Sequence, residues 1–358
     1  MSEQPSLDYL KNRNVFIWQG AWKGGAEAVT FGIADFLLRH GVTPTLGVFK
    51  GEQRTDLPYP QIECPRIFPK RYVAYNNLFA SLWLRRSTKV FDIIVTHTAG
   101  AWRQPGINYF YREPGDLRAL FKSLSYKSKL GYALPYLAAK WALNKANPAI
   151  AASKRAEAFF ESIGVKTFLS TQNFLTTTPP QPSQRSYDSN EPLQLVFVGR
   201  DDKIKNLPWL ERFCADASLN IHLHVIGVNK LNTQHITYHG WVSQSEVQSF
   251  MQNAHALILP SLFEASPLVL IDALAQGLPV LVSKNAAPLE LHKQIIQFDD
   301  DQTLTEAITL LQNNYTKIAD ERFNEADEIR DRFNVDHVLM HEWLAICEHL
   351  QATDPANP

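Results

Sequence analysis

The sequence has little of what marks secreted, membrane-spanning or disordered proteins. Its 358 residues include only three cysteines, Cys64, Cys214 and Cys347, with no CxxC pair, which excludes a disulfide framework and favours reduced structural thiols. No run approaches the roughly 18 uncharged apolar residues of a membrane span, and the first residues lack the basic start and apolar core of a secretory signal. Apolar residues make up 45% and charged residues 20%, as in ordinary globular proteins. We therefore expect a cytoplasmic protein with a sizeable core.

The net charge of −1 hides an asymmetry between the two halves of the chain. Residues 1–188 hold 24 Lys and Arg against 13 Asp and Glu, a net of +11, whereas residues 189–358 hold 11 against 23, a net of −12. Residues 61–155 alone hold 16 basic and 4 acidic residues, interleaved with aromatic side chains. This region is expected to face an anionic partner, and a nucleic acid, a phospholipid surface and a phosphorylated substrate are all open.

Short apolar runs alternate with longer amphipathic stretches, which predicts an α/β protein with parallel sheets covered by helices. The strands are predicted at 15–18, 45–49, 91–96, 107–111, 149–152, 193–198, 221–226, 256–259 and 280–283. The helices are predicted at 26–39, 72–86, 116–146, 153–162, 206–217, 243–252, 267–276 and 286–292, followed by closing helices from 302 to 350. Three prolines and many polar residues in 175–190 predict a linker between two doubly wound domains, 1–174 and 191–335. Residues 336–358 are expected to form a helix that packs back towards the first domain.

The first candidate site is the glycine-rich turn in QGAWKGGAEAV, residues 19–29. Such a turn exposes backbone N–H groups at the start of a helix, where phosphate or carboxylate is favoured. It is neither GxGxxG nor a Walker loop, because Ala26 and Glu27 stand where Lys and Ser or Thr are required. The alternative is that Gly24 and Gly25 only make a tight strand-to-helix turn.

The second candidate site is LVFVGRDDKIKN, residues 195–206. Arg200 and Lys205 follow a strand, at the edge where open α/β sheets bind ligands, and two cations there suit a diphosphate. In the alternative interpretation, this is a basic loop neutralised by Asp201 and Asp202.

The third candidate site lies in residues 256–283, where a buried strand ends at Pro260 and a helix begins near Pro267. Between and after them come two carboxylates separated by seven residues, Glu264 and Asp272. Asp272 falls in an otherwise apolar run, where an unpaired charge is costly, so it needs a hydroxyl or cationic partner. It could bind ribose hydroxyls, or only cap or salt-bridge a neighbouring element.

These segments, in this order, resemble the retaining glycosyltransferases of family 4, which have the GT-B fold. The resemblance rests on GGAE after the first strand, on GR followed by Lys205 and Asn206, and on HGWVSQSEVQSFMQNAHALILPS. It rests most on FEASPLVLIDALAQGLPV, which is similar to the family's two Glu residues in a PS-x-x-E-G-x-P-x-x-x-x-E-A-x-A-x-G-x-P-V frame. The match covers nearly the whole chain and implies two Rossmann-like domains facing each other across a cleft, with the acceptor in the first and the nucleotide-sugar in the second.

The resemblance implies roles for individual residues. Arg200 and Lys205 would bind the diphosphate, and Glu264 would lie near the donor sugar and phosphate. Asp272, one methylene shorter than the family's Glu, would bind the ribose. The other implied donor contacts are Gly240, Trp241 and Val242 beside the base, the segment Ala265, Ser266, Pro267 and Leu268 whose backbone lines the sugar site, and Gly24 and Gly25 in a loop that closes towards the phosphates.

One departure from the family concerns a histidine in the cleft of the first domain, whose place Arg112 takes in NYFYREPGD. Arginine cannot shuttle a proton. It could hold an anionic acceptor or the donor phosphates, which makes it a candidate catalytic residue, or it could pair with Glu113 or Asp116. His97, at the end of another predicted strand, could occupy the cleft instead.

The resemblance implies front-face attack by an acceptor hydroxyl, with the departing nucleoside diphosphate helping to take the proton. The expected donor is a UDP-sugar, with a GDP-sugar second, and the expected acceptor is a cell-surface glycan, lipopolysaccharide, polysaccharide or lipid-linked sugar. No metal or other cofactor is expected. His222 and His224 alternate along a strand but lack a further ligand in the sequence, so we interpret them as ordinary strand residues.

Two other classes of function are open. The chain could be another GT-B enzyme, such as a nucleotide-sugar epimerase or a phosphorylase. It could also be an inactive relative that serves as a binding or scaffold subunit, which the replacements at Arg112 and Asp272 favour and which Arg200, Lys205 and Glu264 oppose.

The basic aromatic region has two parts, residues 67–89 and 121–145, in which cations lie at helical spacing beside Trp83, Tyr132, Tyr136 and Trp141. It could contact the cytoplasmic face of an anionic membrane, which suits a lipid-linked acceptor, or its aromatic residues could belong to the core. A nucleic-acid partner is not expected, because no such module is recognisable and the acidic half would repel a polyanion.

The membrane interpretation predicts that the protein sediments with vesicles of acidic phospholipid, and that high salt weakens the binding because salt screens the attraction. Equal sedimentation with neutral vesicles would count against it.

Overall fold

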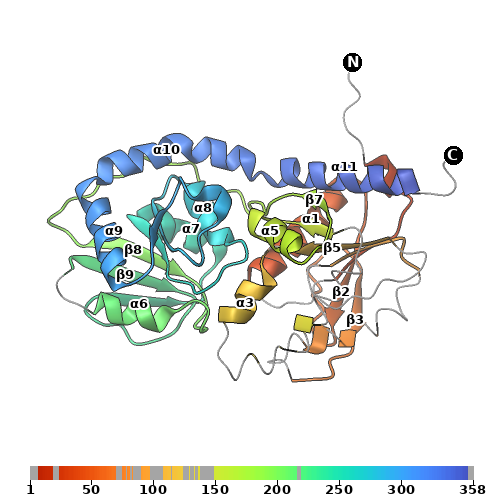
Figure 1. Ribbon diagram of the computed structural model, residues 1–358, viewed down its shortest axis with the longest axis horizontal. Helices are drawn as coiled ribbons and strands as arrows, with labels where there is room; N and C mark the ends of the chain where they lie inside the picture. The colour runs from red at the N-terminus through yellow and green to blue at the C-terminus, as the bar shows by residue number, and fades with distance from the viewer. Residues whose placement is uncertain are drawn as a thin grey trace, which may run out of the picture. The chain divides into compact units, whose positions relative to one another are not determined.

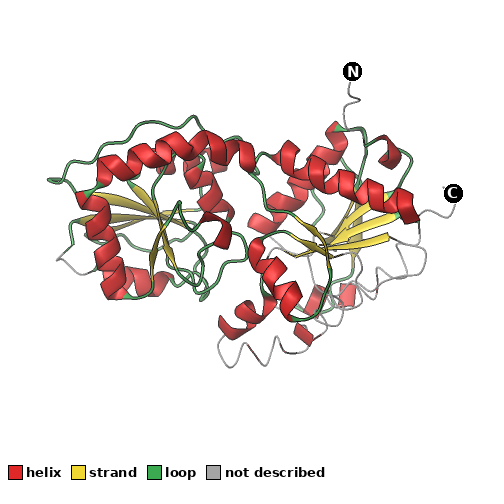
Figure 2. Ribbon diagram, turned by 45° about the horizontal axis from the view of Figure 1, so that its top comes forward, coloured by secondary structure: helices red, strands yellow, loops and turns green. Residues whose placement is uncertain are grey.

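The structure is a computed structural model that describes residues 7–18, 24–69, 75–77, 79–80, 83, 90–96, 108–113, 115–123, 129, 133, 136–137, 149–215 and 219–353. The chain divides into two compact units. Unit 1 comprises Met1–Thr176 and Val335–Pro358, and unit 2 comprises Thr177–Asn334. Each unit contains a parallel β-sheet with helices packed around it (Figures 1 and 2). The predicted α/β fold with two doubly wound sheets is confirmed.

Unit 1 is built on a sheet of seven described strands in the order β3-β2-β1-β4-β5-β6-β7. These strands are β1 (Val15–Trp18), β2 (Thr45–Phe49), β3 (Gln61–Cys64), β4 (Ile93–Thr96), β5 (Asn108–Glu113), β6 (Ala149–Ala151) and β7 (Thr167–Ser170). The helices described in this unit are the 3-10 helix η1 (Asp8–Leu10), α1 (Gly25–Arg39), α3 (Leu117–Ser123), α5 (Lys154–Ser162) and α11 (Val335–Thr353). Strands β1 and β4 are buried at every position because helices cover both faces of a parallel sheet.

Unit 2 is built on six described strands in the order β10-β9-β8-β11-β12-β13. These strands are β8 (Leu193–Val198), β9 (Ile221–Ile226), β10 (Ile236–Gly240), β11 (Ala256–Leu259), β12 (Val280–Ser283) and β13 (Ile296–Phe298). Its described helices are α6 (Leu207–Cys214), α7 (Gln244–Asn253), α8 (Leu268–Leu274), the 3-10 helix η2 (Leu289–Leu291), α9 (Asp301–Asn313) and α10 (Tyr315–Arg332). Helix α7 begins with a capping box, in which the Ser243 hydroxyl accepts from the Glu246 amide and the Glu246 carboxylate accepts from the Ser243 amide.

The polar segment that follows Thr176 is bound to unit 2 by two arginines. Arg185 donates through Nη1 to the carbonyls of Met251, Gln252 and Ala254 at the end of α7, at 2.8 to 3.0 Å. Arg330 of α10 donates to the carbonyls of Pro180 and Ala275. A segment without helix or strand is thereby held along this unit, and its arginine satisfies carbonyls that the end of α7 leaves free.

Most of the predicted elements in the described residues occur close to their predicted bounds. The helix predicted at 286–292 is wrong, because Pro288 has no amide hydrogen to continue a helix and only the three-residue turn η2 forms after it. Helix α3 covers the start of the stretch 116–146, most of which lies outside the described residues. Four strands were not predicted, β3, β7, β10 and β13, and they are the edge strands of the two described sheets.

Helix α11 is attached to unit 1 by one buried and one exposed ion pair. Arg112 of β5 donates through Nε to both carboxylate oxygens of Glu342, at 3.1 Å, and both side chains are 1% exposed. Arg39 of α1 contacts Asp336 at 2.5 Å, with both side chains about half exposed. The sequence separation of Arg112 and Glu342 is 230 residues, so this contact closes the unit around its last helix.

We expect Glu342→Ala to destabilise unit 1 by about 3–5 kcal/mol, because it leaves the Arg112 guanidinium buried without its counter-ion. Arg39→Ala, which removes the exposed pair on the same helix, should cost about 1 kcal/mol or less. Urea denaturation followed by circular dichroism measures both. Similar small losses in the two variants would show that the buried pair does not anchor α11.

Candidate functional site

The candidate site of unit 2 lies where the chain reverses its direction across the sheet. From β8 the chain adds β9 and β10 towards one edge, and it then returns to place β11 on the other side of β8. Open α/β sheets bind ligands beyond the carboxyl ends of the strands at such a switch point. The loops after β8 and β11 are joined there by a hydrogen bond from the Leu262 amide to the Ile204 carbonyl, at 2.7 Å.

The loop after β8 is shaped by Asp202. Its Oδ1 accepts from the amides of Ile204 and Lys205, at 3.1 and 3.0 Å, a local turn that competes with helix formation. Asn206 then adopts a left-handed conformation, with φ of 55°, at the start of α6. Arg200 extends from this loop with its side chain 59% exposed and contacts Asp202 Oδ2 at 3.3 Å.

The structure brings Lys205 and Glu264 together. Lys205 Nζ lies 2.6 Å from Glu264 Oε1, and the hydroxyl of Ser261 donates to the same oxygen, also at 2.6 Å. The side chains of Lys205 and Glu264 are 19% and 13% exposed, so the pair is largely shielded from water. Two predicted site residues from separate motifs therefore form one polar cluster at the switch point.

Asp272 lies in helix α8, and unlike Glu264 it has no cation beside it in the part of the chain that the structure describes. It is 5% exposed, and its carboxylate has no hydrogen-bond or ion-pair partner among the described residues. Burial without a counter-charge disfavours the ionised form and raises the pKa of Asp272 to about 7. A carboxylate in this state needs hydroxyl or cationic donors, as its position in an apolar run had suggested.

The segment between these two carboxylates is short. Ala265, Ser266 and Leu268 are half-buried, and Pro267 is buried at the N-terminal end of α8. Pro267 supplies no side-chain cap, so the first amides of α8 receive no hydrogen bond from it. This arrangement leaves backbone donors next to Glu264.

Gly199 and Gly227 follow β8 and β9, Gly240 is the last residue of β10, and the three glycines allow close contact between the ends of these strands. A Cβ at Gly227 would lie 2.4 Å from the Gly199 carbonyl oxygen, and one at Gly240 would lie 2.2 Å from Asn229 Oδ1. The Gly227 amide donates to the Gly240 carbonyl at 2.6 Å. Directly after Gly240, Trp241 is 65% exposed and Val242 is half-buried. The predicted base-site residues therefore stand at the same edge of the sheet as the two loops.

The histidines of β9 are paired within the sheet. His222 contacts Thr237 at 2.9 Å, and His224 contacts His239 at 3.0 Å and Gln194 at 2.9 Å. Burial lowers the pKa of His224 to about 4, which leaves it neutral at physiological pH. Among the described residues, no cluster of three or more His, Cys, Asp or Glu side chains could hold a metal ion.

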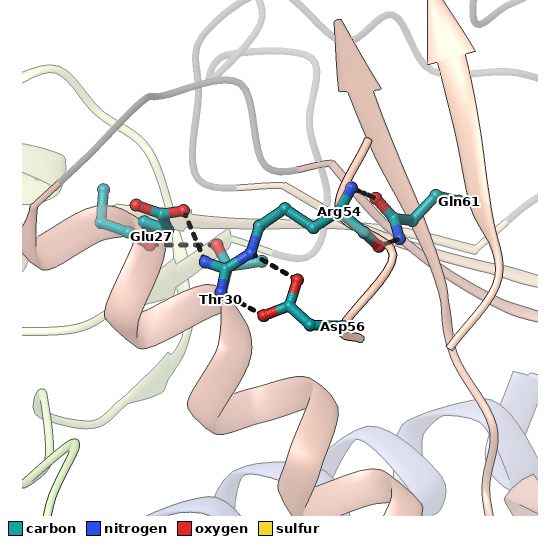
Figure 3. Close-up of polar contacts among 6 residues, drawn as sticks. Glu27, Thr30, Arg54, Asp56 and Gln61 are labelled. Atoms are coloured by element: carbon teal, nitrogen blue, oxygen red, sulfur yellow. Dashed lines mark hydrogen bonds and ion pairs between the residues drawn. The ribbon is translucent and has the colours of Figure 1, made fainter. Parts of the chain in front are cut away.

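In unit 1 the predicted glycine turn is described from Gly24 onwards. Gly24 has φ of 128° and ψ of −158°, a conformation open essentially to glycine, and Gly25 begins α1. Glu27 follows in the first turn of α1, and Figure 3 shows Arg54 between it and Asp56. Arg54 lies 3.6 Å from Glu27 and donates to both oxygens of Asp56, at 2.6 and 3.1 Å. The loop between β2 and β3 thus holds the start of α1.

Arg112 does not lie where the sequence analysis placed it. Its guanidinium is bound to Glu342, to Asn173 Oδ1 at 3.0 Å and to the Gln172 carbonyl at 2.9 Å. Because the residue is 1% exposed and donates through all three guanidinium nitrogens, it has no free face for an acceptor or a phosphate. The partner is Glu342, which the sequence analysis did not consider, and we correct the expected catalytic role to a structural one.

Other expectations for unit 1 fall largely outside the described residues. These include His97, residues 19–23 and most of the basic aromatic region, with Tyr132 and Trp141. Of the described members, Trp83 packs against the core of unit 1, and Tyr136 stacks on Phe121 at 4.9 Å between ring centroids. No helix in the described part of the chain is both long and apolar enough to cross a membrane.

No role had been assigned from the sequence to Ser261, Gly227 or Glu342, and Asp202 had been considered only as a residue that neutralises the basic loop. Ser261 belongs to the PS frame of the third motif, and Asp202 lies inside the second, so both could have been singled out by their closeness to Glu264 and Lys205. Gly227 follows a predicted strand in the same way as Gly199. No signal in the sequence pointed to Glu342.

Three solved structures share the fold of the chain. Sucrose-phosphate synthase from Thermosynechococcus elongatus has a TM-score of 0.77 and 15% identity, over 95% of this chain and 100% of that one. WaaG, a glycosyltransferase involved in lipopolysaccharide biosynthesis, has a TM-score of 0.72 and 16% identity, over 93% and 99%. HepE from Anabaena, in complex with UDP and glucose, has a TM-score of 0.68 and 15% identity, over 95% and 100%. The predicted GT-B fold is confirmed.

A family model and one curated relative match parts of the sequence. The relative is an uncharacterized 41.2 kDa protein in the cps region of Klebsiella pneumoniae, 27% identical over 32% of this chain and 36% of that protein. The match therefore spans about a third of the relative's length. The family model is described as glycosyl transferases group 1 and matches residues 192–314, which hold β8 to α9 and every polar group of the site in unit 2. The likeness to the glycosyl transferases group 1 family is therefore shown for residues 192–314 of unit 2.

Proposed function

We propose that this protein is a retaining glycosyltransferase that transfers a sugar from a nucleotide-sugar to a hydroxyl of a cell-surface glycan, lipopolysaccharide, polysaccharide or lipid-linked acceptor. The observation that carries the proposal is the cluster of Lys205, Glu264 and Ser261 at the switch point of the second sheet, inside the matched family segment. A UDP-sugar is the first candidate donor and a GDP-sugar the second. The structure of HepE with UDP and glucose and the role of WaaG in lipopolysaccharide biosynthesis are consistent with this class of reaction.

In the proposed site the diphosphate binds to Arg200 and Lys205. Arg200 offers an exposed guanidinium that two phosphate oxygens can accept from, and Lys205 offers a point charge in the more shielded part of the cluster. Together they stabilise the negative charge that develops on the leaving diphosphate, which is the main task in this reaction. With this charge offset by two side chains, we propose that no metal ion is required.

The nucleoside binds along the same edge of the sheet. Asp272 accepts hydrogen bonds from the ribose hydroxyls, which supply the donors that the protein itself does not provide in the described residues. The base lies beside Gly240, Trp241 and Val242, where the side chain of Trp241 is 65% exposed. The carboxylate of Asp272 is shorter than the family's Glu, but it sits on the helix that follows the donor loop.

The sugar binds next to Glu264 and the backbone of residues 265–268. The bond from the anomeric carbon to the phosphate oxygen breaks while the acceptor hydroxyl attacks from the same face, and its proton passes to the leaving phosphate. The protein contributes alignment of the reacting groups and stabilisation of the leaving group. Of the two replacements that favoured an inactive scaffold, Arg112 is a structural residue, and the contact between Lys205 and Glu264 is the observation that opposes that alternative.

We expect one of UDP, GDP or ADP, or one of their sugars, to raise the melting temperature of the wild-type protein, because ligand binding to the native state stabilises it by mass action. The double variant Arg200→Ala with Lys205→Ala should lose the response. Lys203→Ala, which removes a cation from the same loop but has no assigned role, should retain it. Stabilisation of the double variant to the same extent would contradict the diphosphate site, and no response from any nucleotide would contradict the proposed function.

We expect the affinity for UDP-glucose to rise about tenfold between pH 6 and pH 8, measured by calorimetry. The free carboxyl of Asp272, with a pKa near 7, binds a proton at low pH, whereas ribose hydroxyls donate to its ionised form, so binding releases the proton. UDP-glucose is the suitable probe because each of its phosphates carries one ester and the shared anhydride oxygen, which leaves no phosphate group that titrates in this range. Asp272→Asn should bind with an affinity independent of pH.

The raised pKa of Asp272 also makes the stability of the free protein depend on pH. A raised pKa means that the stability contributed by protonated Asp272 is greatest below pH 4 and is lost as the pH rises to about 7. Asp272→Asn should therefore be more stable than the wild type at pH 8, by at most about 4 kcal/mol for a shift of this size, and should lose this advantage at low pH. A wild-type affinity and stability that do not change across this range would show that Asp272 is not the titrating group.

A further inference from the structure

Glu264 is held in an unusual way, since its two hydrogen-bond donors converge on one oxygen. Lys205 Nζ and the Ser261 hydroxyl both lie 2.6 Å from Oε1. Neither contact involves Oε2. The carboxylate is therefore fixed through Oε1, and Oε2 is available to accept a hydrogen bond from a ligand.

The two donors differ in how firmly they are placed. Ser261 is fully buried in the loop after β11, and the amide of the next residue, Leu262, is bonded to the Ile204 carbonyl in the neighbouring loop. A serine hydroxyl has only one rotatable bond beyond its Cα, so its position follows the backbone. Lys205 has a long flexible side chain, and its ammonium group is the part that a diphosphate would attract.

We propose that Ser261 is a positioning residue, which keeps the Glu264 carboxylate oriented towards the donor sugar when Lys205 leaves it for the diphosphate. The proposal rests on the function proposed above and adds a residue to it. In the free protein Lys205 and Ser261 share Oε1. In the donor complex the ammonium group turns to the phosphate oxygens, and the hydroxyl of Ser261 remains as the hydrogen bond that fixes Oε1.

When the Lys205 ammonium group moves from Glu264 to the diphosphate, no charge is left without a partner. The diphosphate brings negative charge to Lys205, so the ammonium group keeps an anionic partner throughout. Glu264 loses its cation but keeps one donor from the protein, and it gains hydroxyl donors from the sugar. A carboxylate that is 13% exposed would otherwise be short of hydrogen bonds and free to rotate, which would misplace it for the reaction.

The test compares Ser261→Ala with the wild type in two measurements: the affinity for UDP, GDP and ADP, and the hydrolysis of UDP-glucose, GDP-mannose and ADP-glucose in the absence of an acceptor. Nucleoside diphosphates lack the sugar, so their affinities should change less than about twofold. The kcat for the best nucleotide-sugar should fall about ten- to a hundredfold, the range for a hydrogen bond to a charged group, with little change in KM. A purely structural role would instead alter affinity, KM and melting temperature together.

Four further variants test whether the effect is specific to the contact between Ser261 and Glu264. Ser283→Ala removes a buried hydroxyl that donates to the Ser261 carbonyl and does not reach Glu264, so its kcat should stay close to the wild-type value. Glu264→Gln should lower kcat, and adding Ser261→Ala to it should cause no further loss, because the two residues act as a unit. Ser261→Cys, which nearly preserves the shape and offers a weak donor, should be intermediate.

The proposal is overturned if Ser261→Ala keeps the wild-type kcat, or if its loss multiplies with that of Glu264→Gln. These results are distinct from failure of the proposed function, in which the wild-type protein itself binds none of the nucleotides and hydrolyses none of the nucleotide-sugars.

Discussion

The proposed donor site depends on the ion pair between Lys205 and Glu264. Each side chain is less than one-fifth exposed, and a charge in such a place is costly unless it is paired and hydrogen-bonded. The pair exists because β8 and β11 are neighbours in the sheet, so the loops after them meet although their residues are 59 positions apart. A cation is thus kept at the carboxyl edge of the sheet, where, in the proposed donor complex, the diphosphate replaces Glu264 as its anionic partner.

The two carboxylates of the site differ in how their charge is compensated. Glu264 has a cation and a hydroxyl on one oxygen, whereas Asp272 is buried on α8 with no compensating group in the described residues. Burial therefore raises the pKa of Asp272 to about 7, and its ionisation depends on what binds. The protein itself supplies hydrogen-bond donors to Glu264, whereas in the proposed complex the ribose hydroxyls supply them to Asp272. The difference arises because the loops after β8 and β11 surround Glu264, whereas helix α8 carries Asp272. It is consistent with a site that binds the parts of one ligand through different side chains.

The sequence predicted the centre of each sheet but not its edges. Strands β1, β4, β11 and β12 read as continuous apolar runs because both of their faces are buried, and they were predicted. The strands at the edges, β3, β7, β10 and β13, have the sequences QIEC, TFLS, ITYHG and IQF, in which polar and apolar residues mix. Their strand conformation is set by pairing with an inner neighbour. In each case that neighbour is the preceding strand, separated from the edge strand by a loop or a helix, so the local sequence could not indicate the pairing.

The same distinction explains why the structure brings predicted residues together in unit 2 but places Arg112 of unit 1 in the core. Lys205 and Glu264 follow adjacent strands, so the topology of a parallel sheet was sufficient to bring them together. Arg112 also ends a strand, but its surroundings are decided by α11, which begins more than two hundred residues later and covers the guanidinium with Glu342. A charged residue at the end of a strand is therefore open to a ligand only where no distant element supplies its counter-ion. Sequence motifs show where a strand ends, but only the folded structure shows whether another element buries the residue there.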